Sequence, residues 1–206
     1  WRHDLATGKN VPITQELDYS FDEYQFSSDG RSLWLLAEER GLLPVFKMNP
    51  DGSGFTKVHD QATNTALDTA RDVVVFLNES FNRPAELFAL DTQTGKARQL
   101  THFNDEALAQ LDLGKVESHT FAGAEGREIQ LWLVYPPAYD AGKKYPLVQL
   151  MHGGPHTMVR DAFSFRWNAH VFASPGYFVS WVNRHGSTGF GEKFASSILG
   201  EWGEKP

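Results

Sequence analysis

The stretch "YPLVQLMHGGPH", Tyr145 to His156, decides how the second half of this chain folds. Its apolar run, 147–151, passes directly into the turn sequence His-Gly-Gly-Pro at 152–155. An apolar run that ends at glycine and proline predicts a buried strand followed by a sharp turn. A continuous run of this kind is typical of a strand buried on both faces. The two glycines let the backbone approach another group closely, so the turn is the first place to look for a site.

The bulk composition argues against two kinds of partner. The 206 residues suffice for one large domain or two small ones, and 41% hydrophobic with 22% charged residues is ordinary for a globular protein. A net charge of -7 argues against a nucleic-acid partner, which favours a basic face. No apolar run approaches the length of a membrane span, so no membrane partner is expected.

The sequence indicates no metal and no cofactor. It has no cysteine, which excludes disulfide and thiolate chemistry, and His156, His170 and His185 do not show the spacing of a metal site. The first residues, "WRHDLATGKN", do not have the pattern of a signal peptide. They read as the middle of a longer protein, which leaves cytoplasmic, periplasmic and secreted locations all open.

Three segments in the first hundred residues share one pattern. Each has a strand-like run, then Asp4, Asn49 or Asp91, then a glycine turn and a second alternating run. Aspartate and glycine at these offsets suit hairpin turns. The spacing of about 42 to 45 residues is typical of a four-stranded propeller blade. With further strands predicted at 33–37 and 73–77, residues 1–112 are interpreted as the last blades of a β-propeller. A short antiparallel sandwich is the alternative.

The architecture changes near residue 115. Beyond it the predicted order is strand, strand, strand, helix, strand, helix, with the helices in 164–177 and 191–203 and Phe194, Ile198 and Leu199 on one helix face. This alternation indicates the first part of an α/β sheet.

Longer stretches carry a family resemblance. The segments "KKYPLVQLMHGGPH", "FSFRWNAHVFASPGYFVSWVNRHGSTGFGEKF" and "ILGEWGEKP" resemble the start of the catalytic domain in the prolyl oligopeptidase family of serine peptidases, in the branch of acylaminoacyl peptidases and dipeptidyl peptidase 5-like enzymes. "NESFNRPAELFALDTQTGKARQLTHFN" is similar to the family's last blade, so the resemblance covers nearly the whole chain. The His-Gly-Gly-Pro motif alone occurs in many lipases and esterases, but its combination with the other stretches is specific.

The resemblance implies a fold and a chemistry. Residues 113–206 would be the N-terminal portion of an α/β-hydrolase catalytic domain, incomplete in this chain. Acyl transfer needs backbone N–H donors for a tetrahedral oxyanion, and in this fold one of them comes from a His-Gly-Gly type loop. His152, Gly153 and Gly154 are therefore the expected oxyanion-hole loop, with Gly153 or Gly154 leaving room for the substrate and His152 orienting the loop.

The nucleophile of such an enzyme is expected outside this sequence. The fold places it in a Gly-x-Ser-x-Gly elbow, followed by an acid and a histidine. The nearest candidate is Ser187, but His185 stands two residues before it, where the elbow requires a small residue. Ser187 is interpreted as a turn residue. The chain is expected to be a piece of a longer peptidase and to have no peptidase activity alone.

Four further residues are candidates for substrate binding. Glu38 and Glu39 end a propeller strand, and the resemblance implies that such acidic residues hold a substrate's free ammonium; a solvated turn is the alternative. His185 stands where the family commonly has arginine, in a loop that flanks the cleft. Trp167 is expected to pack the predicted helix on the sheet or to line a pocket.

The leading hypothesis is a serine exopeptidase or oligopeptidase that hydrolyses short peptides through an acyl-enzyme. Its partners would be peptide substrates and the rest of the parent chain, and an oligomer is compatible with the sequence. Which peptide end it prefers stays open. The alternatives are a non-catalytic truncated domain, a propeller-based binding module and, against the evidence of the blades, a small-ester esterase.

Overall fold

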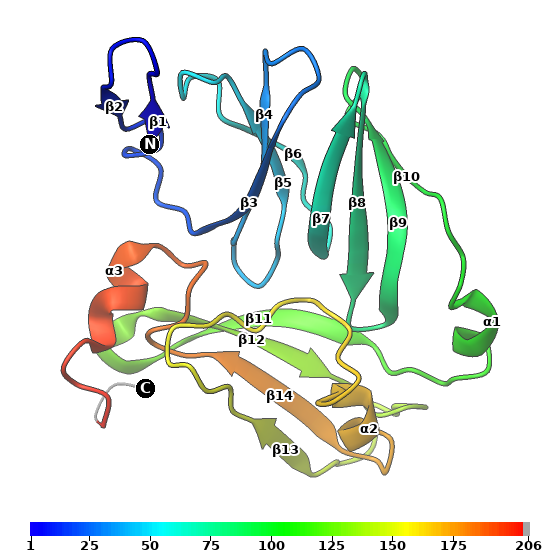
Figure 1. Cartoon of the computed structure of the whole chain (residues 1–206). Coiled ribbons are helices and arrows are strands. Elements are labelled where there is room, and N and C mark those ends of the chain that lie inside the picture. The colour runs from blue at the N-terminus through cyan, green and yellow to red at the C-terminus, as the bar shows by residue number, and fades with distance from the viewer. Residues whose placement is uncertain (204–206) are drawn as a thin grey trace.

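A computed structural model describes residues 1–203 of the chain as three four-stranded sheets and one two-stranded hairpin (Figure 1). The first two sheets lie side by side and the third lies across one end of them. No helix in this range is long and apolar enough to cross a membrane.

The first half is built of antiparallel strands that pair in chain order. The hairpin and the two sheets comprise β1 (Arg2–His3) and β2 (Asn10–Val11); β3 (Phe21–Phe26), β4 (Leu33–Ala37), β5 (Val45–Met48) and β6 (Thr56–His59); and β7 (Thr63–Ala70), β8 (Val73–Ser80), β9 (Arg83–Asp91) and β10 (Ala97–Gln99). The strands predicted at 33–37 and 73–77 are confirmed, and β8 is a central strand as expected.

The three predicted repeat turns are confirmed as hairpin turns. They join β1 to β2, β5 to β6 and β9 to β10. At Asp4 and Asp91 the local bonding is the same, because one carboxylate oxygen accepts the backbone N–H groups two and three residues later. Asn49 instead receives the backbone N–H of Gly52 on its carbonyl. The repeat therefore yields two successive four-stranded sheets, while their place in a propeller stays a prediction.

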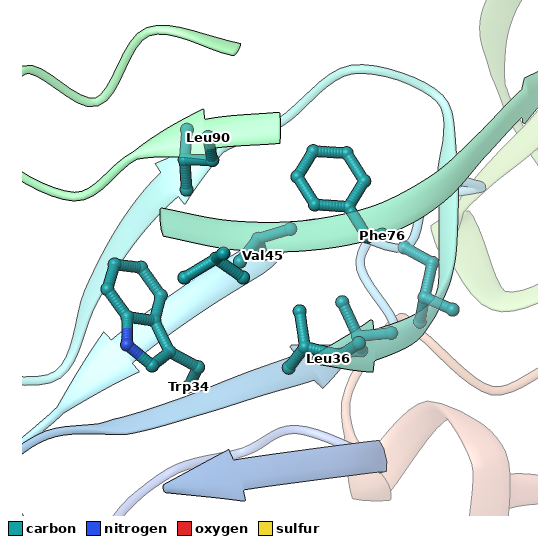
Figure 2. Packing of buried hydrophobic residues seen from close by; sticks show 8 residues of the cluster. Trp34, Leu36, Val45, Phe76 and Leu90 are labelled. Carbon is teal, nitrogen blue, oxygen red and sulfur yellow. The ribbon is translucent and has the colours of Figure 1, made fainter. Parts of the chain in front are cut away.

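The first two sheets share an apolar core (Figure 2). Its buried members come from both sheets and from the segments beside them, namely Trp34, Leu36, Leu43, Val45, Leu67, Val74, Phe76 and Leu90. Strand β4 is buried along its whole length because its alternate side chains, Leu33, Leu35 and Ala37, enter a second cluster. Full burial of one such large side chain contributes about 1.5–3 kcal/mol, so this shared core fixes the two sheets against each other.

The third sheet mixes antiparallel and parallel pairing in the order β11-β12-β14-β13. Its strands are β11 (Val116–Ala122), β12 (Glu128–Val134), β13 (Leu147–Leu150) and β14 (Phe178–Asn183), and the short helices are α1 (Asp105–Leu108), η1 (Ala124–Gly126), α2 (Ala169–Ala173), α3 (Glu192–Ala195) and η2 (Ser196–Ile198). Strands β13 and β14 are parallel, and the connection between them contains α2. The predicted order of three strands, a helix, a strand and a helix is confirmed.

Three details of the prediction are wrong. Strand β13 is not buried on both faces: within residues 1–203 it forms the edge of the sheet with β14 as its one partner, and Leu147 is 59% exposed. The helix expected over 164–177 is limited to α2, because Asn168 caps it by accepting the backbone N–H of His170. Leu199 is exposed, unlike Phe194 and Ile198, because the backbone becomes extended there.

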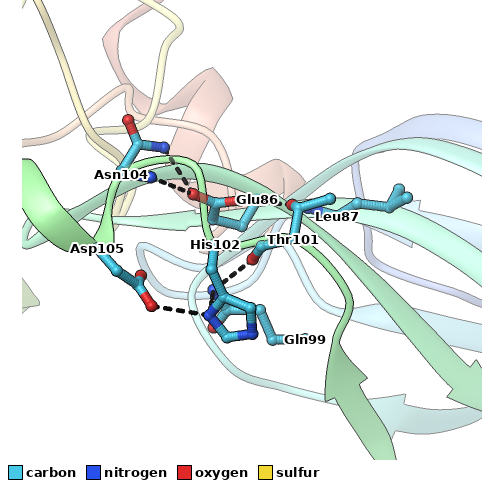
Figure 3. A network of polar contacts seen from close by, with 7 residues as sticks. All are labelled: Glu86, Leu87, Gln99, Thr101, His102, Asn104 and Asp105. Carbon is cyan, nitrogen blue, oxygen red and sulfur yellow. Dashed lines mark hydrogen bonds and ion pairs between the residues drawn. The ribbon is translucent and has the colours of Figure 1, made fainter.

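The segment that leads into the third sheet is fastened by a buried carboxylate (Figure 3). Glu86 on β9 is 1% exposed and accepts both the backbone N–H and the side-chain N–H of Asn104, at 2.9 and 2.7 Å, and the Thr101 hydroxyl. Burial opposes ionisation of Glu86, but the hydrogen bonds from Thr101 and Asn104 outweigh it and hold the pKa of this carboxyl below its ordinary value.

We predict that Glu86→Gln destabilises the protein by about 1.5–3 kcal/mol at pH 7, the typical contribution of hydrogen bonds to a charged group. Because the folded pKa is lowered, this contribution is complete above the ordinary glutamate pKa of 4.5 and is lost as the pH falls through the folded value. Urea unfolding of the unaltered protein and of Glu86→Gln, at pH 7 and at successively lower pH, measures this difference in the free energy of unfolding. The matched control is Glu106→Gln in exposed α1. A difference that stayed constant down to pH 3 would contradict the assignment.

Candidate active site at the His-Gly-Gly turn

The turn after β13 requires glycine at one of its two glycine positions. Gly154 has φ of +135°, which L side chains rarely adopt, and a Cβ there would lie 3.0 Å from the His156 backbone nitrogen and 3.1 Å from Thr157 side-chain atoms. Gly153 has open space at its Cβ position. The backbone conformation therefore depends on Gly154, a distinction that the sequence did not make.

The carbonyl of Gly153 is held from one side by two side chains. His152 Nδ1 lies 2.8 Å from this oxygen, and the Thr157 hydroxyl donates to it at 2.9 Å. In a planar trans peptide the C=O and the following N–H point in opposite directions. The Gly154 N–H is thus directed away from His152 and Thr157, and within residues 1–203 no acceptor in the protein takes it. It is an exposed donor with a fixed direction.

The surroundings of His152 favour its neutral form. Burial lowers its pKa and Arg184 adds to that effect, whereas the Gly153 carbonyl acts against it. Its Nε2 lies 3.0 Å from the hydroxyl of Ser187. The ring therefore connects the turn after β13 to the turn after β14.

Ser187 is completely buried. Its backbone N–H donates to the Arg184 carbonyl, as in a turn, and its hydroxyl faces His152. Although a serine beside a histidine resembles a nucleophile and its base, an inaccessible hydroxyl offers no room for a substrate carbonyl.

A hollow of about 440 Å³ opens beside the turn and is shared by the first and third sheets and their loops. Its lining comprises Ser20, Phe21, Asp22, Glu38, His156, Thr157, Met158, Arg160 and Thr188. Arg160 donates to Asp22 at 2.9 Å and to Glu38 at 2.8 Å. Two carboxylates from the first half of the chain and one guanidinium from the second half therefore stand beside the glycine turn.

The two adjacent glutamates differ sharply. Glu38 is 8% exposed, with one oxygen bound to Arg160 and the other, Oε2, buried with no hydrogen-bond partner in the described chain. Glu39 has both oxygens engaged, by the Tyr19 hydroxyl at 2.8 Å and by Lys57. Burial and the Glu39 carboxylate raise the pKa of Tyr19 to about 12. The alternative of a solvated turn is therefore wrong for Glu38, because the turn packs against the loop that carries Arg160.

The other two predicted substrate-binding residues lie away from the hollow. His185 is 2% exposed and packs edge-on against Phe194, with ring centroids 5.4 Å apart. Trp167 is half exposed and stacks on Phe172 of α2, at 6.4 Å. Neither contributes to the lining of the hollow, and a role in substrate binding stays a prediction for both.

Sequence reasoning missed three residues of the site, Thr157, His156 and Arg160. Thr157 and His156 follow the motif directly, so their proximity to the glycines was available as a signal. Arg160 had no local signal, because its partner Glu38 is 122 positions away in the sequence. No group of three or more His, Cys, Asp or Glu side chains in the described part of the chain could hold a metal ion.

Comparison with known proteins finds that the chain is similar to peptidases. A model described as the prolyl oligopeptidase family matches residues 163–206. The chain is 31% identical to dipeptidyl-peptidase 5 of Porphyromonas gingivalis and 33% identical to dipeptidyl-peptidase 5 of Trichophyton equinum. These alignments cover 97% and 99% of this chain but 29% of each relative. The chain therefore spans less than a third of the length of these relatives.

Solved structures share the fold. The acylaminoacyl peptidase of Pyrococcus horikoshii matches with a TM-score of 0.76 at 24% identity, over 90% of this chain and 28% of that one. An acylaminoacyl peptidase in complex with Z-Gly-Gly-Phe-chloromethyl ketone matches with a TM-score of 0.79 at 24% identity, over 93% of this chain and 29% of that one.

We predict that Gly154→Ala and Gly153→Ala differ in their effect on the fold. A Cβ at position 154 meets both strain and close backbone contact, and a residue forced into so sparsely populated a conformation costs about 1–3 kcal/mol. Gly153→Ala is expected to change the unfolding free energy by less than about 0.5 kcal/mol, because its Cβ enters open space. Denaturant unfolding of both variants measures this. Equal destabilisation by the two substitutions would contradict the geometry.

Proposed function

Because this chain belongs to the prolyl oligopeptidase family, we propose that it forms part of a serine exopeptidase that hydrolyses short peptides through an acyl-enzyme. The relatives named dipeptidyl-peptidase 5 and the acylaminoacyl peptidase structures support exopeptidase action on peptides. The observation that carries the proposal is the exposed Gly154 N–H, whose direction is fixed by the bonds to the Gly153 carbonyl.

That N–H is suited to an oxyanion. When a serine attacks a peptide carbonyl, the oxygen gains negative charge, and donors that already point at it stabilise the transition state without reorganising. Gly154 has no side chain between its N–H and a bound substrate. Removal of one such donor from a serine peptidase lowers kcat by about 10²–10³-fold.

The proposal assigns the nucleophile to sequence outside these 206 residues. No serine in the sequence stands in a Gly-x-Ser-x-Gly elbow, and Ser187 is buried. In the same way, residues 1–112 are proposed as the last blades of a β-propeller and 113–206 as the first part of an α/β-hydrolase domain. The two four-stranded sheets and the mixed third sheet support this division.

Glu38 is the proposed anchor for the free ammonium of a peptide substrate. Its Oε2 is a buried acceptor beside the hollow and lacks a donor, whereas both oxygens of Glu39 are already taken. A buried acceptor without a partner is unfavourable, and Glu38 lines the hollow, so a side-chain rotation that turned Oε2 toward the hollow would let a substrate ammonium bind it with both charge and a hydrogen bond.

The first test uses the complete product of the gene that encodes this chain, beside residues 1–206 alone. We expect the complete product to hydrolyse dipeptidyl or N-acyl-aminoacyl anilides and to be inactivated by a fluorophosphonate. The 206-residue chain is expected to do neither. Mass mapping of the labelled peptide should identify a serine other than Ser187. Failure to cleave any of these anilides, or labelling at Ser187, would refute the proposal.

The second test separates free from acylated substrates. In the complete product, Glu38→Gln should raise KM for a dipeptidyl anilide with a free amino group by about 10-fold or more, the loss expected for a charge-assisted hydrogen bond. KM for the N-acetylated anilide should stay within twofold. Glu39→Gln is the comparison variant and should change KM less, because Tyr19 and Lys57 already occupy its carboxylate. An equal rise in KM for both substrates would mean that Glu38 serves the fold alone.

A further inference from the structure

The carboxyl ends of β13 and β14 carry two turns that are 35 residues apart in sequence and joined by one hydrogen bond. Because the strands are parallel neighbours, their following turns emerge at the same edge of the sheet, where α/β proteins bind ligands. The bond joins His152 Nε2 to the Ser187 hydroxyl at 3.0 Å. Ser187 belongs to neither the proposed oxyanion donors nor the hollow, so its buried hydroxyl needs a separate explanation.

The contacts of His152 favour one neutral tautomer. The Gly153 carbonyl is an acceptor only, so the Nδ1 that lies 2.8 Å from it must carry the proton. Nε2 then holds a lone pair, and the Ser187 hydroxyl donates to it. In the opposite tautomer Nδ1 would face the Gly153 carbonyl as a second acceptor 2.8 Å away, and it would compete with that carbonyl for the single proton of the Thr157 hydroxyl, 3.0 Å from Nδ1.

From this arrangement we propose that Ser187 and Thr157 are positioning residues: Ser187 selects the His152 tautomer that holds the Gly153 carbonyl, Thr157 holds the same carbonyl, and together they aim the Gly154 N–H. Ser187 acts through His152, and Thr157 acts on the Gly153 carbonyl directly, with its hydroxyl also 3.0 Å from His152 Nδ1. The role of this arrangement in catalysis rests on the proposed function. The His152 tautomer and the direction of the Gly154 N–H do not depend on that function.

Burial explains why the serine is effective. A hydroxyl that is 0% exposed has no water to exchange with, so its one proton stays directed at His152. Replacement by alanine would leave a buried Nε2 without a donor, which removes the preference for the tautomer that serves Gly153. In other proteins too, the hydrogen bond made by one ring nitrogen of a functional histidine decides which of the two nitrogens carries the proton.

The test is a spectroscopic measurement on the complete gene product, labelled with ¹⁵N at histidine and glycine. Long-range ¹H–¹⁵N correlation reports which ring nitrogen carries the proton, and a His152→Gln variant assigns the signals. We expect the Nδ1–H tautomer in the unaltered chain. Ser187→Ala should lose the single-tautomer pattern and shift or broaden the Gly154 amide signal. Ser197→Ala is the matched control, because that serine donates to the Phe194 carbonyl and does not contact the turn.

A proton on Nε2 in the unaltered chain would overturn the proposal, as would a Ser187→Ala spectrum with both signals unchanged. If Ser187→Ala does not give a folded spectrum, Thr157→Val decides, because Thr157 is exposed and its loss leaves the core intact. An unchanged Gly154 amide signal in Thr157→Val would then contradict the proposed positioning role. No step of this test measures hydrolysis, so a failed peptidase assay and a failed tautomer assay remain distinguishable.

Discussion

The site depends on the close approach of the Gly41 turn to the Trp132 ring. Gly41 has φ of +84°, and a Cβ there would lie 2.8 Å from a carbon of this ring. The Trp132 indole N–H donates to the Val159 carbonyl, and the Asp161 N–H donates to the Gly41 carbonyl at 2.7 Å. A larger residue at position 41 would separate the first sheet from the third. Because glycine stands there, Glu38 reaches the loop after β13.

Two arrangements meet at the hollow. The close approach brings carboxylates from the first sheet to a guanidinium from the loop between β13 and β14, so that Arg160 balances Asp22 and Glu38. The parallel pairing of β13 with β14 brings the His-Gly-Gly turn beside the turn that contains Ser187. A polar hollow beside an outward backbone donor results from these two arrangements, and neither half of the chain could form it alone.

Local patterns predicted those parts of the fold whose cause is local. The turns at Asp4 and Asp91 were predictable because each carboxylate bonds to the backbone within three residues. Strand β4 was predictable because five consecutive apolar residues leave no solvent face. The burial of β13 was predicted wrongly, because the same apolar run fits an edge strand and a central strand equally well. The position of β13 in the sheet is a property of pairing, not of its residues.

The sequence by itself determined the order of the elements, the glycine turn after the apolar strand and the family resemblance, because these rest on residues close together in the chain. Only the tertiary structure decided which glycine the turn requires, which glutamate is buried and which hydroxyl holds His152. The first answer depends on the backbone angle that the turn adopts at Gly154. The other two depend on contacts between residues 122 and 35 positions apart, Arg160 with Glu38 and His152 with Ser187. No local pattern encodes such a pair; the packing of the sheets brings its members together.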